Sequence, residues 1–176
     1  MRKLLLLSTS AFALALAVPA YADTVTGTAA AETLTGSLSA DVINALGGDD
    51  TVYANGGRDN VTGGDGDDFL YGGRGADRLN GGDGSDRLWG QRGDDKLVDD
   101  QGDTVDALRG GGGDDVIFAN FRDVIFGGRG NDRIVVAYPG AMTVDCGKGV
   151  DSVTFNQAHP HVLLVGCEHV RIVSAG

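Results

Sequence analysis

Acidic residues recur at a fixed interval along most of this 176-residue chain. Each is followed two positions later by an aliphatic residue, and the pair returns every nine residues. Carboxylates held at one spacing can line up in the fold and bind a hard cation, because such ions take several oxygen ligands. The pairs in unbroken register are Glu32/Leu34, Asp41/Ile43, Asp50/Val52, Asp59/Val61, Asp68/Leu70, Asp77/Leu79, Asp86/Leu88 and Asp95/Leu97.

The interval is lost once, after Asp95, and then returns with small changes in length. The later pairs are Asp106/Leu108, Asp115/Ile117, Asp123/Ile125 (one residue early), Asp132/Ile134 and Asp151/Val153. Cation sites are therefore expected to be strongest between Asp50 and Asp95. They are expected to fail near residues 101–104 and to recover at Asp115 and Asp132.

Glycines precede the acids, also in register. Residues 63–71 form a complete G-G-x-G-x-D-x-U-x unit, in which U is aliphatic, and further complete units end at Asn80, Trp89, Phe118 and Val135. The first six residues must reverse the chain tightly, which glycine permits because it reaches positive φ without a Cβ clash. The last three form a short strand whose middle side chain points inward.

One turn and one strand make half of an 18-residue coil, twice the nine-residue interval. Stacked coils give two parallel sheets with a thin aliphatic seam, and stacking is required because each coil buries too little alone. The sequence therefore predicts an all-β fold, a parallel β-roll or β-solenoid, over residues 23–135. Residues 136–176 depart from the repeat and are predicted to form a C-terminal β cap. Its short strands are expected at 143–144, 152–155, 162–165 and 170–173.

The stacking also predicts the ion. Turns two units apart lie about 4.8 Å apart, so two carboxylates and nearby backbone carbonyls can supply the six to eight oxygens that Ca²⁺ prefers. Asp and Gly also suit turns in general, but that explains composition and not register. The predicted metal ligands are Asp50, Asp68 and Asp86 along one edge, Asp59, Asp77 and Asp95 along the other, the pair Asp115 and Asp132, and the turn glycines Gly64, Gly66, Gly73, Gly75, Gly82 and Gly84.

These units resemble the RTX (repeats-in-toxin), or hemolysin-type, calcium-binding repeats over roughly residues 32–135. The resemblance implies a parallel β-roll that folds when calcium is present. Residues 145–153 and 166–170 also resemble the endings of secreted bacterial proteins that carry these repeats. Toxins and proteases of this kind usually leave the cell by a C-terminal signal and carry a toxin or enzyme domain. This chain instead shows an N-terminal signal and no such domain.

The N-terminus predicts export. Arg2 and Lys3 precede an apolar run that ends at Val18, and residues 20–22, Ala-Tyr-Ala, suit a signal peptidase. A signal peptide is therefore predicted at residues 1–22, cleaved after Ala22, which makes the mature chain secreted and extracellular. The apolar run is shorter than the roughly 20 residues of a membrane-spanning helix. No membrane span is expected after the signal is removed.

Charge and cysteine content limit the possible partners and predict a cross-link. Acidic residues outnumber basic ones 25 to 14, which argues against nucleic acid because phosphate binding needs an excess of Lys and Arg. Cys146 and Cys167 are the two cysteines of the chain. In an exported protein such a pair favours a disulfide, with two free thiols as the alternative.

Motifs for catalysis do not occur: the chain has neither G-x-S-x-G nor H-E-x-x-H. No catalytic residue and no organic cofactor is assigned, and the chain is expected not to be an enzyme. His159 and His161 could bind zinc but have no neighbouring third ligand. A hydrolase site in the C-terminal third, using these residues or His169, is the less favoured alternative.

An aromatic ladder is predicted on one sheet face, because Tyr53, Tyr71 and Trp89 occupy the last position of units 18 residues apart. Cross-strand packing is the favoured role. The alternative is an adhesin surface that binds a cell-surface glycan or protein. The corresponding positions on the other face are Asn44, Thr62, Asn80 and Val98.

Overall fold

The computed structural model describes residues 22–99, 104–120, 122–137, 142–156 and 161–173. These residues form short strands that alternate between two sheets and include no helix. The odd-numbered strands are β1 Thr24–Thr26, β3 Val42–Gly47, β5 Asn60–Asp65, β7 Arg78–Asp83, β9 Lys96–Val98, β11 Val116–Ala119, β13 Arg133–Val136, β15 Ser152–Phe155 and β17 His169–Ile172. The even-numbered strands are β2 Thr33–Thr35, β4 Thr51–Tyr53, β6 Phe69–Arg74, β8 Arg87–Arg92, β10 Ala107–Gly112, β12 Val124–Arg129, β14 Met142–Lys148 and β16 Val162–Val165.

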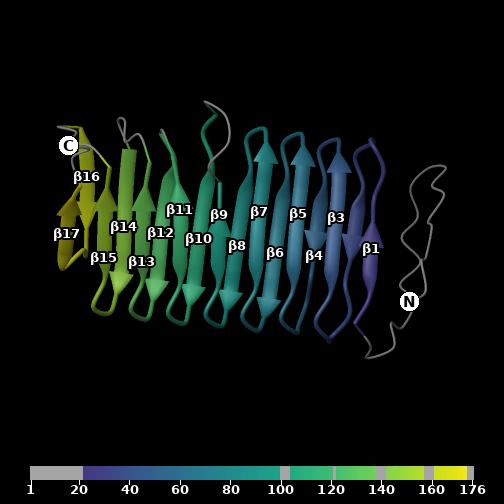
Figure 1. The fold of residues 1–176 in the computed structure, drawn as a ribbon, viewed down its shortest axis with the longest axis horizontal. Coiled ribbons are helices and arrows are strands. Elements are labelled where there is room, and N and C mark those ends of the chain that lie inside the picture. The colour runs from purple at the N-terminus through teal and green to yellow at the C-terminus, as the bar shows by residue number, and fades with distance from the viewer. Residues whose placement is uncertain (1–21, 100–103, 121, 138–141, 157–160, 174–176) are drawn as a thin grey trace.

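Each sheet contains every second strand in chain order, and neighbouring strands are parallel. The chain thus winds through one sheet, turns, crosses into the other and turns again, as Figure 1 shows along the long axis of the molecule. This is the predicted parallel β-roll. Among the described residues, none forms a helix with the length and apolar character needed to cross a membrane.

The core is the aliphatic seam that the repeat predicts. Leu70 pairs in register with Leu88 in one sheet, and Leu79 pairs with Leu97 in the other. These side chains have no exposed surface. Because a single residue per strand fills the seam at these coils, the stack of coils and the turns must supply the remaining stability.

The irregular segment changes a turn and leaves the sheets intact. Leu88 pairs with Leu108 although they are 20 residues apart, and Leu108 pairs with Ile125 although only 17 separate them. The added and missing residues therefore lie in the turns. Of the predicted break at 101–104, residues 101–103 lie outside the described residues.

Strands β14–β17 lie close to the strand positions predicted for the C-terminal segment. They continue both sheets in parallel register, with β16 and β17 as the outermost strands. The division of the chain at residue 135 stays a prediction. The predicted signal peptide lies outside the described residues except for Ala22.

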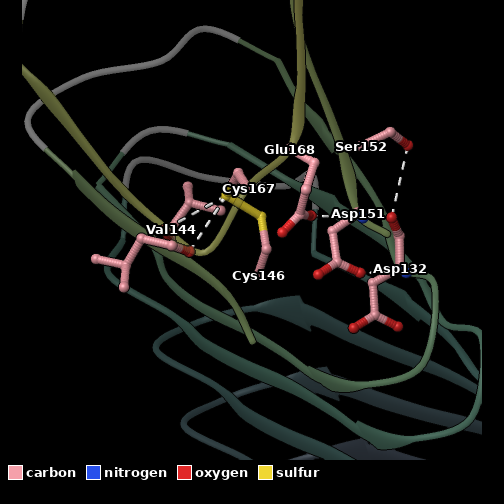
Figure 2. The surroundings of a disulfide bond; sticks show 8 residues. Asp132, Val144, Cys146, Asp151, Ser152, Cys167 and Glu168 are labelled. Carbon is pink, nitrogen blue, oxygen red and sulfur yellow. Dashed lines mark hydrogen bonds between the residues drawn. A yellow bond between two sulfur atoms is a disulfide. The ribbon is translucent and has the colours of Figure 1, made fainter. Parts of the chain in front are cut away.

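Two further predictions are confirmed. Cys146 and Cys167 form a disulfide with a Cα–Cα distance of 5.2 Å, shown beside the last turns in Figure 2. The aromatic ladder is also present: the ring centroids of Tyr53 and Tyr71 are 5.0 Å apart, and those of Tyr71 and Trp89 are 4.6 Å apart, with nearly parallel planes.

Candidate metal centres

The acidic residues form two ladders, one along each row of turns. In each aspartate of these ladders one oxygen, Oδ1, accepts a hydrogen bond from the backbone N–H of the acid one coil earlier, as in Asp50 N–H to Asp68 Oδ1 at 2.8 Å. We name the rows after one member. The Asp68 edge contains Glu32, Asp50, Asp68, Asp86, Asp106 and Asp123, and the Asp59 edge contains Asp41, Asp59, Asp77, Asp95, Asp115, Asp132, Asp151 and Glu168.

The second oxygen of most of these carboxylates has no hydrogen-bond partner although it is buried. A buried polar atom without a partner costs free energy, and such atoms are rare unless a ligand or ion satisfies them. The atoms are the Oδ2 oxygens of Asp50, Asp59, Asp68, Asp77, Asp86, Asp95, Asp115, Asp132 and Asp151. The list includes every aspartate predicted as a ligand.

The backbone of each turn explains why these oxygens are free. In all nine turns, the residue four positions before the aspartate has positive φ, and its N–H does not donate to the Oδ2 oxygen. These residues are Leu46, Asn55, Gly64, Gly73, Gly82, Gln91, Gly111, Gly128 and Gly147.

In three other turns the residue that donates to the carboxylate does not have positive φ, and there the second oxygen has a backbone partner within the turn. Thr28 N–H donates to Glu32 Oε2 at 2.7 Å, and Ser37 N–H donates to Asp41 Oδ2. Asn120 N–H donates to Asp123 Oδ2 at 2.7 Å. The second residue of the turn therefore decides whether the acid is capped by its own backbone or left available for an ion.

The first glycine of the turn leaves room in front of the free oxygen. A Cβ placed on Gly63 would collide with Asp68 Oδ2 and lie 2.6 Å from the carbonyl oxygen of Gly81, one coil later. Gly90 stands in the same relation to Asp95 Oδ2 and the Gly110 carbonyl. Each such space is lined by a carboxylate oxygen and a carbonyl oxygen, which are the donors that Ca²⁺ takes.

The predicted glycines share one conformation. Gly64, Gly66, Gly73, Gly75, Gly82 and Gly84 all have positive φ. At Gly66 the backbone also passes so close to the previous coil that a Cβ would lie 2.5 Å from the Gly48 carbonyl oxygen. Their direct role as metal ligands stays a prediction.

The electrostatics of the ladders favour a bound cation. The pKa of Asp59 is raised to about 7 and that of Asp115 to about 8, mainly by burial and in smaller part by the neighbouring carboxylates of each ladder. The ladder N–H of Asp41 and that of Asp95, respectively, act in the opposite direction. Without a cation these carboxylates resist ionisation, and a divalent ion between them would remove that penalty.

Two features of the turns are not among the sequence predictions. An outer ladder of exposed side chains also links the coils: Asp67 N–H donates to Asp49 Oδ1 at 3.0 Å, and Asp114 N–H donates to Asp94 Oδ1 at 2.9 Å. The signal for it is the second acid directly before the repeat acid. Asp151 is not a predicted ligand, yet its Oδ2 is free like the others and lies beside the disulfide in Figure 2.

The histidines give no comparable site. His161 and His169 are exposed, and no group of three metal-ligating side chains in the described part of the chain includes either. His159 lies outside the described residues. The group that does gather, from Asp86, Asp99 and Asp106, lies beside the irregular turn.

The fold and these turns define a parallel β-roll whose turns are lined by the oxygen donors that hard cations prefer. The family model described as the RTX calcium-binding nonapeptide repeat (4 copies) matches residues 21–61, 62–97 and 100–134. The match covers more than half of the chain, so the chain belongs to this family, and its cofactor is Ca²⁺. Comparison with curated proteins gives no match.

Proposed function

We propose that this chain is a secreted structural protein in which Ca²⁺ ions bind between successive turns and hold the coils together. The observation that carries the proposal is the correspondence between positive φ at the second turn residue and a free, buried Oδ2 four residues later. The proposed ligands are the predicted aspartates Asp50, Asp59, Asp68, Asp77, Asp86, Asp95, Asp115 and Asp132, joined by Asp151.

Calcium would act as a structural link because the stacked aspartates contribute little stability without it. Each coil contributes little apolar surface, and neighbouring aspartates such as Asp77 and Asp95 place like charges one strand spacing apart. A divalent ion bound to both would replace repulsion by attraction and would satisfy the free oxygens. Binding to the folded state alone then stabilises it by mass action.

Export supports the same role. The N-terminal pattern that predicts a signal peptide would place the mature chain outside the cytosol. The disulfide between Cys146 and Cys167 fits an oxidising compartment. A cell-surface or matrix location is proposed on this basis, and no reaction is assigned to the chain.

The aromatic ladder favours packing over an adhesin role. Tyr71 stacks on Tyr53 and Trp89 with interplanar angles of 7° and 6°. The rings therefore cover one another's faces, which are the surfaces that a sugar ring would need. The ladder is best explained as cross-strand packing that stabilises the even-numbered sheet.

Calcium binding to the mature chain tests the proposal directly. Equilibrium dialysis at millimolar Ca²⁺ should give several ions per chain, and circular dichroism should show β structure and a melting temperature that both fall in EDTA. Asp77→Asn should lower the number of ions bound, whereas the exposed Asp83→Asn should not. Equal melting temperatures in EDTA and in calcium would refute the proposal.

A further inference from the structure

The irregular turn between β9 and β10 gathers more carboxylates than any other part of the described chain. The carboxylate oxygens of Asp86, Asp99 and Asp106 lie within 4.8 Å of one another. All three residues are buried. No other group of three ligating side chains gathers this closely among the described residues.

The ladder holds this group in place. Asp86 Oδ1 accepts the N–H of Asp68 at 2.8 Å, and Asp106 Oδ1 accepts the N–H of Asp86 at 2.8 Å. Thr104 Oγ1 donates to the Gly84 carbonyl oxygen at 2.5 Å, which fastens the enlarged turn to the coil before it. The group therefore keeps the spacing of the regular sites although the turn is longer.

Asp86 supplies an independent sign of a missing ligand. Its side chain is 1% exposed, and its Oδ2 has no hydrogen-bond partner. A Cβ on Gly81 would collide with this Oδ2 and lie 2.7 Å from Asp99 Oδ2. Both oxygens thus border the space that the absent Gly81 side chain leaves.

A comparison with the regular turns shows what is different here. At Gly63 and Gly90 the second oxygen bordering this space is a backbone carbonyl, that of Gly81 or Gly110. At Gly81 it is the carboxylate of Asp99, because Asp99 stands where the repeat places its first glycine. A full negative charge replaces a dipole at the same position.

We propose that Asp86, Asp99 and Asp106 form a three-carboxylate Ca²⁺ site that binds more tightly than the regular turns and fills first as calcium rises. The proposal rests on the proposed function. Calcium affinity increases with the number of charged ligands, and an added charge at this range strengthens binding considerably in a partly buried site. The same charge predicts a stronger preference for trivalent La³⁺ over Ca²⁺ than at a regular turn.

Calorimetric titration of the mature chain with Ca²⁺, and competition with La³⁺, tests this inference. Asp99→Asn keeps the shape of the side chain and removes its charge, and Asp99→Gly restores the first glycine of the repeat. Asp83→Asn is the matched control, because Asp83 lies in the Gly81–Asp86 turn but is exposed. Circular dichroism in calcium verifies that each variant is folded.

The wild-type chain should show one ion bound at least about tenfold more tightly than the rest. Both Asp99 variants should weaken that ion to the affinity of the others and reduce its La³⁺ preference, and Asp83→Asn should change it less than about twofold. The inference would be overturned if one tightly bound ion persisted in both Asp99 variants, or if all ions bound the wild-type chain with equal affinity. Several ions bound with equal affinity would leave the proposed function standing, whereas no binding at all would overturn both.

Discussion

The two edges of the roll use the same carboxylates differently. Along the Asp59 edge, free Oδ2 atoms continue without a gap from Asp59 to Asp151. Along the Asp68 edge, the regular run of free oxygens ends at Asp86, after which the turns change length and Asp123 is capped by Asn120. Yet the Oδ1 ladder persists on both edges.

The difference separates two roles of one side chain. Oδ1 links adjacent coils whatever the length of the turn, since Asp86 and Asp106 keep this bond across a separation of 20 residues. In the nine turns whose second residue has positive φ, Oδ2 is left without a hydrogen-bond partner and is the proposed metal ligand. Coil stacking and calcium binding can therefore be varied independently.

The largest expected effect comes from removing a carboxylate that has both roles. Asp77→Ala should lower the unfolding free energy in calcium by about 3 kcal/mol or more, because it removes a ladder bond, a ligand and a bound ion. Asp123→Ala removes a ladder bond and the hydrogen bond from Asn120 N–H, but no proposed calcium ligand, so its cost should be the same in calcium and in EDTA. Thermal unfolding of both variants in both conditions checks the comparison; an equal calcium dependence would contradict it.

The pH dependence should reverse when calcium is removed. Burial raises the pKa of Asp95 to about 7 and that of Asp115 to about 8, above the value near 4 of an unfolded chain. The folded apo chain then holds more protons than the unfolded chain between about pH 4 and pH 8, so its stability falls as pH rises through this window.

Calcium affinity should instead rise with pH, since the ion must displace these protons. Each protonated site should lose about tenfold in affinity per pH unit below its pKa. Melting temperatures in EDTA at pH 5 and pH 8, with calcium titrations at the same pH values, measure both trends. An apo chain that melts higher at pH 8 would contradict the sign.

A smaller effect should follow from changing the turn conformation alone. Gly73→Ala places a Cβ at positive φ and against the Asn55 carbonyl, which should cost about 2 kcal/mol and weaken the Asp77 site. Ser37→Gly should do the opposite at Asp41, because it permits the positive φ that frees Oδ2. Equilibrium dialysis should then give one more bound ion than in the wild type. An unchanged number of ions would mean that positive φ at this residue is not what permits metal binding.

Much of this arrangement is predictable from sequence because the repeat has a strict period. The nine-residue interval gives the coil, the inward aliphatic residue and the ladder of acids, including the pairing of Asp68 with Asp86. The two roles of the carboxylate oxygens are not predictable in this way, since they depend on φ at residues such as Leu46 and Gln91. Neither leucine nor glutamine indicates positive φ.

The cluster at Asp99 is missed for a related reason. Loss of register near residues 101–104 predicts loss of the cation site. In the structure the flanking strands return to register, and the Asp99 carboxylate lies near that of Asp86. An insertion breaks the nine-residue period of the sequence, whereas a stacked fold requires only that the strands on either side return to register.

The smallest expected effect tests whether positive φ itself strains the Asp68 edge. Leu46 has φ 80° and an exposed side chain, so it carries the steric cost of a left-handed backbone without an obvious gain from packing. Leu46→Gly should remove that cost and keep Asp50 Oδ2 free. The stability should rise by up to about 1 kcal/mol, the relief of strain being partly offset by the greater freedom of glycine in the unfolded chain. The gain should appear in EDTA as well as in calcium, with the number of bound ions unchanged. A loss of one ion would mean that the Leu46 side chain, and not its φ, maintains the site.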